Sequence, residues 1–275
     1  MRFSVHHETL YRYSEPVRLA PHMLRLNPRP DGARVLTGSL TVDPAPVARH
    51  ESMDRFGNRI THVSFEGRSD LLRIDSCFDL DIATAAPWCD PGLARLPWLA
   101  SPCDELADYR PDCGHDVAVQ TFAAALASES RWAALPFLDR LCQTLFTRLD
   151  RHIRLEGAAQ APAQTLASGR GACRDLTVLF MAACRSLGIA ARFVSGYQAH
   201  ADTPDGHRHL HAWPEVFLPG AGWRGFDPTH GTAVTDGHLA LCAAPDQAAT
   251  MPIEGSFYGN GVTATLDYRV RIATA

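Results

Sequence analysis

Cys173 stands where a glycine-rich turn gives way to a helical pattern. Gly169 and Gly171 precede it, and apolar residues follow it at spacings of three and four, which is typical of one buried helix face. The free backbone N–H groups and the positive end of the helix dipole would then point towards the sulfur and favour the thiolate. Because the thiolate is the nucleophile in cysteine enzymes, this position predicts a reactive thiol. Without partner residues, the same pattern would equally describe a buried cysteine at a helix start.

His211 and Asp227 could supply the partners that such a thiolate needs. His211 opens a segment that has the pattern of a β-hairpin, and Asp227 ends the returning strand. A loop from Leu218 to Gly220 pairs the two residues directly, whereas a loop from Leu218 to Gly222 shifts the register by two and keeps both side chains on one face. In either register the carboxylate can reach one ring nitrogen and leave the other to the sulfur. The three residues predict a nucleophile, a base and an orienting carboxylate.

A helix and an antiparallel sheet must position these residues, and the later part of the chain has the pattern of both. Residues 115–275 predict a catalytic domain in which two helices, near 117–127 and 138–153, precede the helix of Cys173, and Gly188 ends that third helix. The strand candidates of this domain are residues 191–197, 211–218, 223–227 and 263–272.

The earlier part of the chain has a different pattern of apolar and polar residues. Residues 1–84 alternate short strand-like runs with turn residues and predict an N-terminal antiparallel β-sandwich, with strand candidates at residues 3–13, 33–42, 59–65 and 71–80. Residues 85–114 carry five prolines, a density that prevents long helices and fits a connecting segment. The sequence therefore predicts an α+β protein with two domains, whose nucleophile lies at a helix N-terminus packed on an antiparallel sheet.

The segments around the three residues resemble the core of the bacterial transglutaminase-like cysteine proteases. The similar stretches are GRGACRDLTVLFMAACRSLGIAARFVSGY, HAW and GWRGFDPTHG. In that family the cysteine after the glycine turn, the histidine of HAW and the aspartate of FDPT form the catalytic triad, which carries over to Cys173, His211 and Asp227. HHETLYRYSEPVRLAPHMLRLNPRP and DRFGN also resemble the family's N-terminal β domain, as does the tail through Gly255 and Gly259.

This resemblance implies a papain- or transglutaminase-like core that cleaves an amide or peptide bond through a thioester on the enzyme. The implied substrate is a peptide or protein amide, and no cofactor or metal is expected. Arg174 stands where relatives often carry glutamine, which could alter substrate preference or the field at the sulfur. Pro214 lies in a predicted strand, where its missing N–H favours an edge or a bulge. Neither departure removes a member of the triad.

Several residues could line the substrate groove or stabilise the oxyanion. The N–H group of Cys173 is the first expected oxyanion donor, and the loop before it offers side-chain amides for a second. The residues assigned to these roles are Gln160, Gln164, Arg174, Tyr197 and Trp213. The loop of residues 199–208 and the segment around Trp98 are expected to shape the groove further.

A metal-binding interpretation stays open beside the catalytic one. His207, His209 and His211 recur at every second position, which on a strand would put three imidazoles on one face, where they could bind a transition metal. The preceding Asp202 and Pro204 favour a loop instead.

Other functional interpretations use the same residues differently. His230 could compete with His211 as the base. Transfer of the acyl group to an amine, rather than to water, would make the protein a transamidase. A non-catalytic module whose β domain binds a partner would be expected to have lost a triad residue, whereas all three are present.

Composition narrows the classes of partner. Lys and Arg number 26 against 30 Asp and Glu, and the net charge of -4 provides no basic field to attract nucleic acid. No apolar run reaches the roughly 18 residues of a membrane span, and the N-terminus lacks the pattern of a secretion signal, so we expect a cytoplasmic protein without a membrane partner. Most of the eight cysteines then fit as small buried hydrophobes in a reducing compartment.

Overall fold

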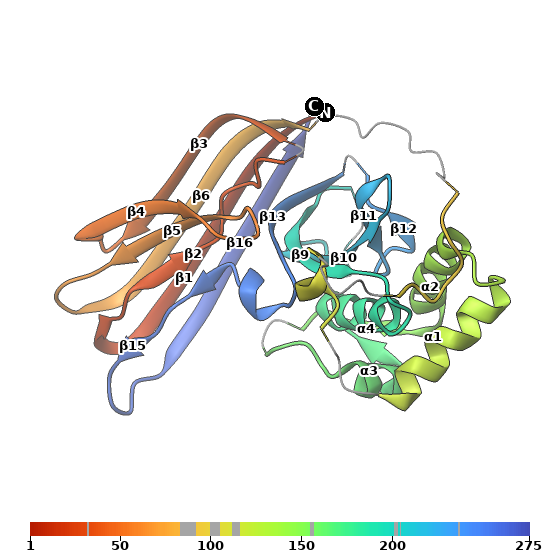
Figure 1. The fold of residues 1–275 in the computed structure, drawn as a ribbon. Coiled ribbons are helices and arrows are strands. Elements are labelled where there is room, and N and C mark those ends of the chain that lie inside the picture. The colour runs from red at the N-terminus through yellow and green to blue at the C-terminus, as the bar shows by residue number, and fades with distance from the viewer. Residues whose placement is uncertain are drawn as a thin grey trace.

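The computed structural model describes residues 1–31, 33–82, 92–99, 105–111, 116–154, 157–200, 203, 205–235 and 237–275. Layered strands form one side of the molecule, and helices around a separate sheet form the other (Figure 1). Several residues of the predicted connecting segment and the loop before His207 lie outside the described residues: Pro87, Cys89, Pro91, Pro102, Cys103, Cys113, Asp202 and Pro204.

The first sheet is built around the long strand β1 (Arg2–Leu19), which alternates exposed and buried residues along its first half. It pairs antiparallel with β6 (Ser69–Ile82) and with β16 (Ala264–Thr274). Strand β3 (Ala33–Asp43) continues the sheet beyond β6, and the short β15 (Phe257–Tyr258) pairs with the end of β1.

A second antiparallel sheet covers the first. Its order is β14 (Ile253–Glu254), β2 (His22–Leu24), β5 (Arg59–Ser64) and β4 (Ala48–Met53). The two sheets share one hydrophobic core, to which they contribute Phe3, Leu24, Val63, Ile74 and Leu80. This arrangement confirms the predicted antiparallel β-sandwich.

The end of the chain returns to this sandwich. We expected residues 263–272 to form a strand of the catalytic domain, but β16 pairs with β1 in register from Phe3↔Thr274 to Tyr13↔Ala264. Strands β14 and β15 join the sandwich as well. The expected strand exists, but its partner lies some 260 residues away, and an alternating pattern does not specify which sheet a strand joins.

A separate antiparallel sheet carries the histidine and the aspartate. Its order is β12 (Thr232–Ala233), β11 (Gly222–Asp227), β10 (His211–Leu218), β9 (Ala191–Gln198) and β13 (His238–Ala244). Leu218 pairs with Gly222, so the hairpin adopts the longer of the two predicted loops. In this register His211 and Asp227 are not directly opposite but share one face of the sheet.

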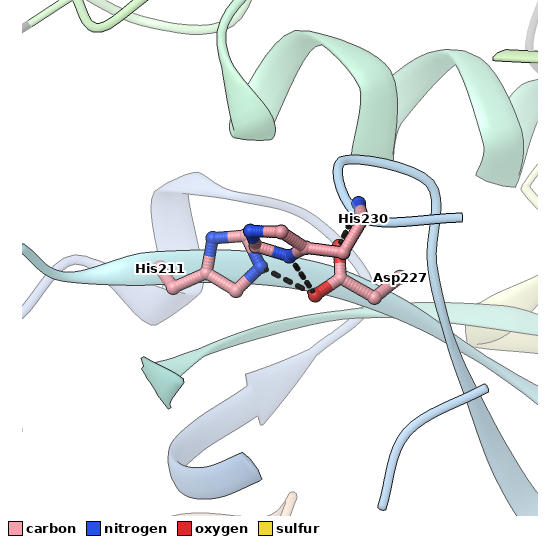
Figure 2. A group of neighbouring side chains, drawn as sticks. All are labelled: His211, Asp227 and His230. Carbon is pink, nitrogen blue, oxygen red and sulfur yellow. Dashed lines mark hydrogen bonds and ion pairs between the residues drawn. The ribbon is translucent and has the colours of Figure 1, made fainter. Parts of the chain in front are cut away.

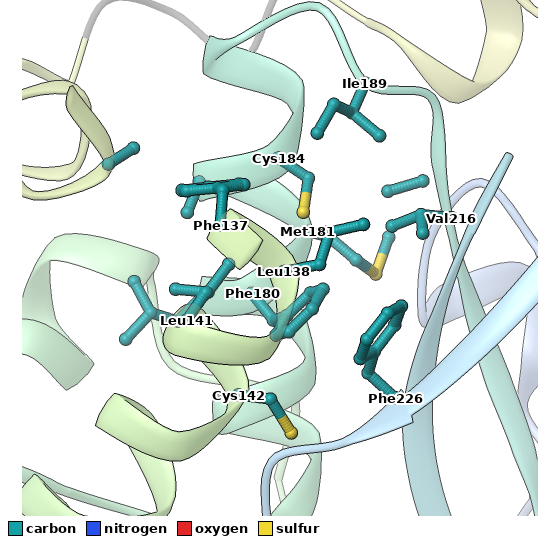
Figure 3. Packing of buried hydrophobic residues seen from close by; sticks show 14 of the residues in the cluster. Phe137, Leu138, Leu141, Cys142, Phe180, Met181, Cys184, Ile189, Val216 and Phe226 are labelled. Carbon is teal, nitrogen blue, oxygen red and sulfur yellow. The ribbon is translucent and has the colours of Figure 1, made fainter. Parts of the chain in front are cut away.

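Helices pack on the other face of this sheet. They are α1 (Val117–Glu129), α2 (Ala134–Arg148), α3 (Pro162–Ser168) and α4 (Cys173–Ser186). The buried stripe of α4 and residues of α2 form one core with the sheet, as Phe137, Phe180, Val216 and Phe226 show in Figure 3. Gly188 follows α4 with a φ of 79°, a backbone conformation that glycine adopts without strain, so the predicted end of the helix is confirmed.

Short elements complete the described chain. The pair β7 (Asp150–Arg151) and β8 (Arg170–Gly171) is parallel and lies just before α4, and single 3₁₀ turns occur at η1 (Ala107–Tyr109) and η2 (Ala248–Thr250). Among the described residues, no helix combines the length and the apolar character that crossing a bilayer requires.

The sandwich and the sheet that carries His211 and Asp227 share buried contacts. That sheet contributes three residues to the hydrophobic core of the sandwich: Tyr197, Leu239 and Leu241. The hydroxyl group of Tyr197 also forms a hydrogen bond with Nδ1 of His7 at 2.7 Å. The sandwich therefore packs directly against the sheet that holds His211.

Candidate functional site

Cys173 is the first residue of α4 and is half-buried. The turn before it depends on two glycines. Gly169 ends α3 in the left-handed conformation at a φ of 65°. A Cβ atom on Gly171 would lie only 2.9 Å from Cβ of Asp175 and 3.0 Å from Cδ1 of Leu176. The predicted glycine turn therefore leads directly into α4, and Cys173 lies in the first turn, where backbone N–H groups have no acceptor within the helix.

Asp175 fixes this turn from inside the protein. Its carboxylate is fully buried and accepts hydrogen bonds from the backbone N–H groups of Ala172 at 2.7 Å and Gln160 at 2.8 Å. Arg154 completes the set with an ion pair at 2.6 Å. Through these three partners Asp175 holds together the segments on both sides of Cys173.

The ring of His211 and the backbone N–H of Ala212 lie near enough to the sulfur of Cys173 to stabilise its thiolate. Burial by itself would raise the pKa of the thiol. The hydrogen bond and the positive charge of His211 outweigh that effect, so the pKa of Cys173 lies below its usual value. The site therefore favours a thiolate beside an imidazolium.

His211 is held between the sulfur and Asp227. Its Nε2 atom lies 2.8 Å from Oδ2 of Asp227 (Figure 2). Nδ1 is then the ring nitrogen that remains for the sulfur. Burial would lower the pKa of His211, but the charge and hydrogen bond of Asp227, with those of Cys173, raise it to about 10. The structure thus brings together the three residues to which the sequence assigned a triad.

Asp227 is fully buried and receives two further imidazoles. Nδ1 of His230 lies 2.7 Å and Nε2 of His238 lies 2.9 Å from the same Oδ2 atom that binds His211. Burial would raise the pKa of this carboxyl group, but His211 and the other two histidines hold it well below its usual value. Asp227 is therefore a stable anion at the centre of three histidines.

The sequence did not assign this role to His230 or His238. His230 was considered as a competing base, and the structure instead directs its Nδ1 atom at Asp227 within the turn after β11. A histidine three residues after an aspartate in a turn is the local signal for this contact. His238 comes from β13, and no local spacing relates it to Asp227.

A metal ion is a second possible occupant of this cluster. The ligand atoms of His211, Asp227 and His230 lie within 4.8 Å of one another. The N···O separations of 2.7 and 2.8 Å are those of hydrogen bonds, whereas donors around a tetrahedral zinc ion at roughly 2.0–2.1 Å stand about 3.3 Å apart. Shared protons therefore explain the observed geometry better than a metal site.

The predicted alternative of three histidines on one strand is not supported. Strand β10 begins at His211, and Arg208 forms an isolated bridge instead of continuing the strand. The ring of His209 forms hydrogen bonds elsewhere: its Nε2 atom lies 2.8 Å from Asp205, and its Nδ1 atom lies 2.6 Å from the hydroxyl of Tyr268. His207 and His209 do not join His211 in any possible metal-ligand group among the described residues.

The five residues predicted for the groove lie in different surroundings. Gln160 is half-buried beside the turn of Cys173, whereas Gln164 is exposed on α3. Nη1 of Arg174 donates to the carbonyl of Arg154 at 2.6 Å. Tyr197 is fully buried against His7 and lines no open groove, which corrects its assignment. The sandwich covers the face of β9 on which Tyr197 lies.

Trp213 packs inside the site. It is 1% exposed, and its ring contacts those of His211 and His238 at centroid distances of 6.0 and 5.2 Å. A cavity of about 470 Å³ borders Trp213, His238 and Trp223 and reaches Arg29 of the sandwich. Neither Cys173 nor His211 lines this cavity, so it is not where a substrate bond would meet the sulfur.

The other described cysteines differ electrostatically from Cys173. Burial raises the pKa of Cys142 and of Cys242 to about 12 and raises that of Cys184 well above the usual value. The pKa of Cys77 is raised as well, mainly by desolvation. Within the part of the chain that the structure describes, Cys173 alone has a lowered thiol pKa.

A cysteine at the N-terminus of a helix, facing a histidine and an aspartate on an antiparallel sheet, defines a papain- or transglutaminase-like fold. Residues 3–80 match the model of the bacterial transglutaminase-like N-terminal region, and residues 120–228 match that of the transglutaminase-like superfamily. The chain thus combines a region that matches the bacterial transglutaminase-like N-terminal family with a later region that matches the transglutaminase-like superfamily.

Relatives with the same organisation occur in mycobacteria. Uncharacterised proteins of Mycobacterium tuberculosis and Mycobacterium bovis are 28% identical over 98% of this chain and 92% of their own length. An uncharacterised protein of Mycobacterium leprae is 24% identical, with 98% of each chain covered. Their lengths indicate that both parts of the molecule occur together in these proteins.

A solved structure shares the fold. The crystal structure of a candidate cysteine protease from Cytophaga hutchinsonii superimposes with a TM-score of 0.77, covering 99% of this chain and 90% of the other. The two sequences are 19% identical, so this similarity establishes the fold.

Proposed function

We propose that the protein is a thiol-dependent hydrolase that cleaves an amide or peptide bond in a peptide or protein. Cys173 acts as the nucleophile, His211 as the general acid and base, and Asp227 as the orienting carboxylate. The observation that carries this proposal is the pairing of the Cys173 sulfur with an imidazole whose Nε2 atom lies 2.8 Å from Asp227.

The first half of the reaction forms a thioester. The thiolate of Cys173 attacks the carbonyl carbon of the substrate and forms a new C–S bond. Nδ1 of His211 donates its proton to the departing nitrogen as the C–N bond breaks, and the amine leaves. Asp227 keeps the imidazole ring oriented while its charge changes.

The second half returns the enzyme to its starting state. Neutral His211 accepts a proton from water, and the resulting hydroxide attacks the thioester carbon. The C–S bond breaks, a carboxylic acid leaves, and the thiolate and imidazolium form again. Attack by an amine instead of water would yield a transamidation product from the same intermediate.

The developing oxyanion needs two donors. The backbone N–H of Cys173 is in the first turn of α4, where no acceptor exists within the helix. Gln160 suits the second position better than Gln164, because the backbone of Gln160 is fixed by Asp175 at 2.8 Å and Gln164 is exposed. Arg174 and the neighbouring turn then border the substrate.

A peptide-library assay tests this proposal. The purified protein is incubated with peptides in H₂¹⁸O, with and without an added primary amine, and products are identified by mass spectrometry. Hydrolysis incorporates one ¹⁸O atom in the new carboxyl group, whereas transamidation yields an amine adduct. We expect ¹⁸O-labelled products from the wild type and none from Cys173→Ala or His211→Ala.

Cys77→Ala serves as the matched control, because Cys77 lies on β6 of the sandwich, away from the site, and its thiol pKa is raised. This variant should keep wild-type turnover. Cleavage that persists in Cys173→Ala would refute the assignment, and amine adducts in excess of hydrolysis would make the protein a transamidase.

A further inference from the structure

Asp227 is bonded to more donors than its two oxygens can fully accommodate. Oδ1 accepts from the backbone N–H groups of Thr229 at 3.0 Å and His230 at 3.3 Å, and Oδ2 faces the rings of His211, His230 and His238. A carboxylate offers about four lone-pair sites, two on each oxygen. Three rings therefore share the two sites of Oδ2, and only one of these rings belongs to the proposed triad.

The tautomer of His238 follows from its second contact. The backbone N–H of Thr235 points at Nδ1 of His238 at 3.3 Å, so Nδ1 acts as an acceptor. The hydrogen atom of the neutral ring is then on Nε2, which donates to Asp227 at 2.9 Å. Since this histidine is 6% exposed and packs edge-on against Trp213, its ring has one orientation available.

His238 also differs from His211 in charge. Burial lowers the pKa of His238, even though the hydrogen bond and charge of Asp227 act in the opposite direction. Among the described residues, the ionisable groups around this ring are Asp227 on β11, His211 on β10 and His230 in the turn, with Cys142 of α2 near the same carboxylate. His238 thus provides a hydrogen bond without a second positive charge, and the charge of Asp227 remains available to His211.

We propose that His238, assisted by His230, is a positioning residue that holds Oδ2 of Asp227 on Nε2 of His211. Without these donors the buried carboxylate could rotate about its Cβ–Cγ bond and would spend less time on His211. The imidazolium would then be less stabilised, and less of Cys173 would be thiolate. This inference rests on the proposed function, because it assigns a role within the same triad.

Replacing a histidine by glutamine or by asparagine distinguishes the loss of its hydrogen bond from the loss of its ring. The amide nitrogen of glutamine occupies nearly the place of Nε2 in histidine, whereas that of asparagine corresponds to Nδ1. His238→Gln therefore keeps the donor to Asp227, and His238→Asn has the same chemistry but too short a reach. At His230, where Nδ1 is the donor, His230→Asn keeps the contact and His230→Gln places its amide differently.

The measurement is the rate of Cys173 alkylation by iodoacetamide as a function of pH, with thermal unfolding recorded for every variant. We expect His238→Asn to slow alkylation near pH 6 by about tenfold and to move the midpoint of the profile up by about one pH unit. His238→Gln should stay within about threefold of the wild type. A purely structural role would lower the unfolding temperature of both variants and leave the midpoint in place.

An unchanged or lower midpoint in His238→Asn overturns the inference, because it would mean that His238 competes with His211 for Asp227 or does not act on it. If the variants at 238 fail to fold, the pair at 230 decides by the same criterion, with His230→Asn expected to resemble the wild type. If wild-type Cys173 itself has an ordinary thiol pKa, the proposed function fails as well, so the two failures are distinguishable.

Discussion

Arg208 and Val270 form an antiparallel backbone bridge that ties the last strand of the chain to the segment leading into His211. Two residues before this bridge partner, Tyr268 of β16 donates or accepts a hydrogen bond at 2.6 Å with Nδ1 of His209. The other ring nitrogen of His209 lies 2.8 Å from Asp205. Because β16 also pairs with β1, the β-sandwich reaches the immediate neighbourhood of the proposed triad.

Replacing Tyr268 by phenylalanine removes this link and leaves the ring in place. We expect Tyr268→Phe to lower the free energy of unfolding by about 1 kcal/mol, the usual contribution of one such hydrogen bond. Urea denaturation measures the change. Tyr258→Phe is the control, since Tyr258 is 65% exposed and should tolerate the loss of its hydroxyl. Equal losses in the two variants would show that the contact to His209 contributes nothing specific.

Thiol labelling tests the electrostatics of Cys173. The pKa of this thiol is lowered because His211 outweighs the effect of burial, so part of it stays ionised below the usual range of thiols. We expect iodoacetamide to modify Cys173 ahead of Cys142, Cys184 and Cys242, whose pKa values are raised by burial. Peptide mapping at increasing pH measures the order.

His211→Ala provides the counterpart to that experiment. Without the imidazolium, burial dominates and the pKa of Cys173 should rise, so labelling near neutral pH should slow by about tenfold or more. A labelling rate that does not depend on His211 would show that this histidine does not stabilise the thiolate.

Asp175 offers a test of the turn that holds the nucleophile. Asp175→Ala removes the ion-pair partner of Arg154 and the acceptor of two backbone N–H groups, and we expect it to cost roughly 3 kcal/mol of unfolding free energy. Glu129→Ala is the matched control, because it breaks the exposed ion pair with Arg140 at 3.1 Å and should cost less than about 1 kcal/mol. Urea titration compares the two variants. Similar losses of unfolding free energy would show that Asp175 contributes no more than an exposed ion pair.

The local parts of this architecture could be predicted from the sequence. The glycine turn, the helix of Cys173 and the hairpin are short-range patterns. Because side chains alternate along a strand, His211 and Asp227 lie on one face of the hairpin with either predicted loop. The α+β class and the β-sandwich were confirmed for the same reason. These features depend on neighbours within about twenty residues.

Contacts between distant segments could not be predicted in this way. The pairing of β16 with β1, the burial of Tyr197 by the sandwich and the approach of His238 to Asp227 all join parts of the chain that no periodic pattern relates. In each case the residue type suits the strand in which it lies, but tertiary packing determines which distant segment that strand contacts. Sequence therefore located the proposed triad but not the histidines and strands that surround it.

The acid stability of the protein should depend on Asp227. Its pKa in the folded protein lies well below the ordinary value of 3.8, so the stabilisation from its ionised form is fully present above about pH 4 and is lost as pH falls towards the folded value. Asp227→Asn removes this contribution and leaves three imidazoles without their anion, which should cost roughly 3–5 kcal/mol near pH 7. The difference from the wild type should shrink as pH falls from about 4 towards the lowered pKa of Asp227, because the unfolded wild type then binds a proton that the folded wild type does not. Urea unfolding at a series of pH values measures the difference, and Asp267→Asn on the exposed face of β16 should show no such trend. A difference that stays constant down to the lowest pH would mean that the carboxylate gains no net stabilisation from His211, His230 and His238.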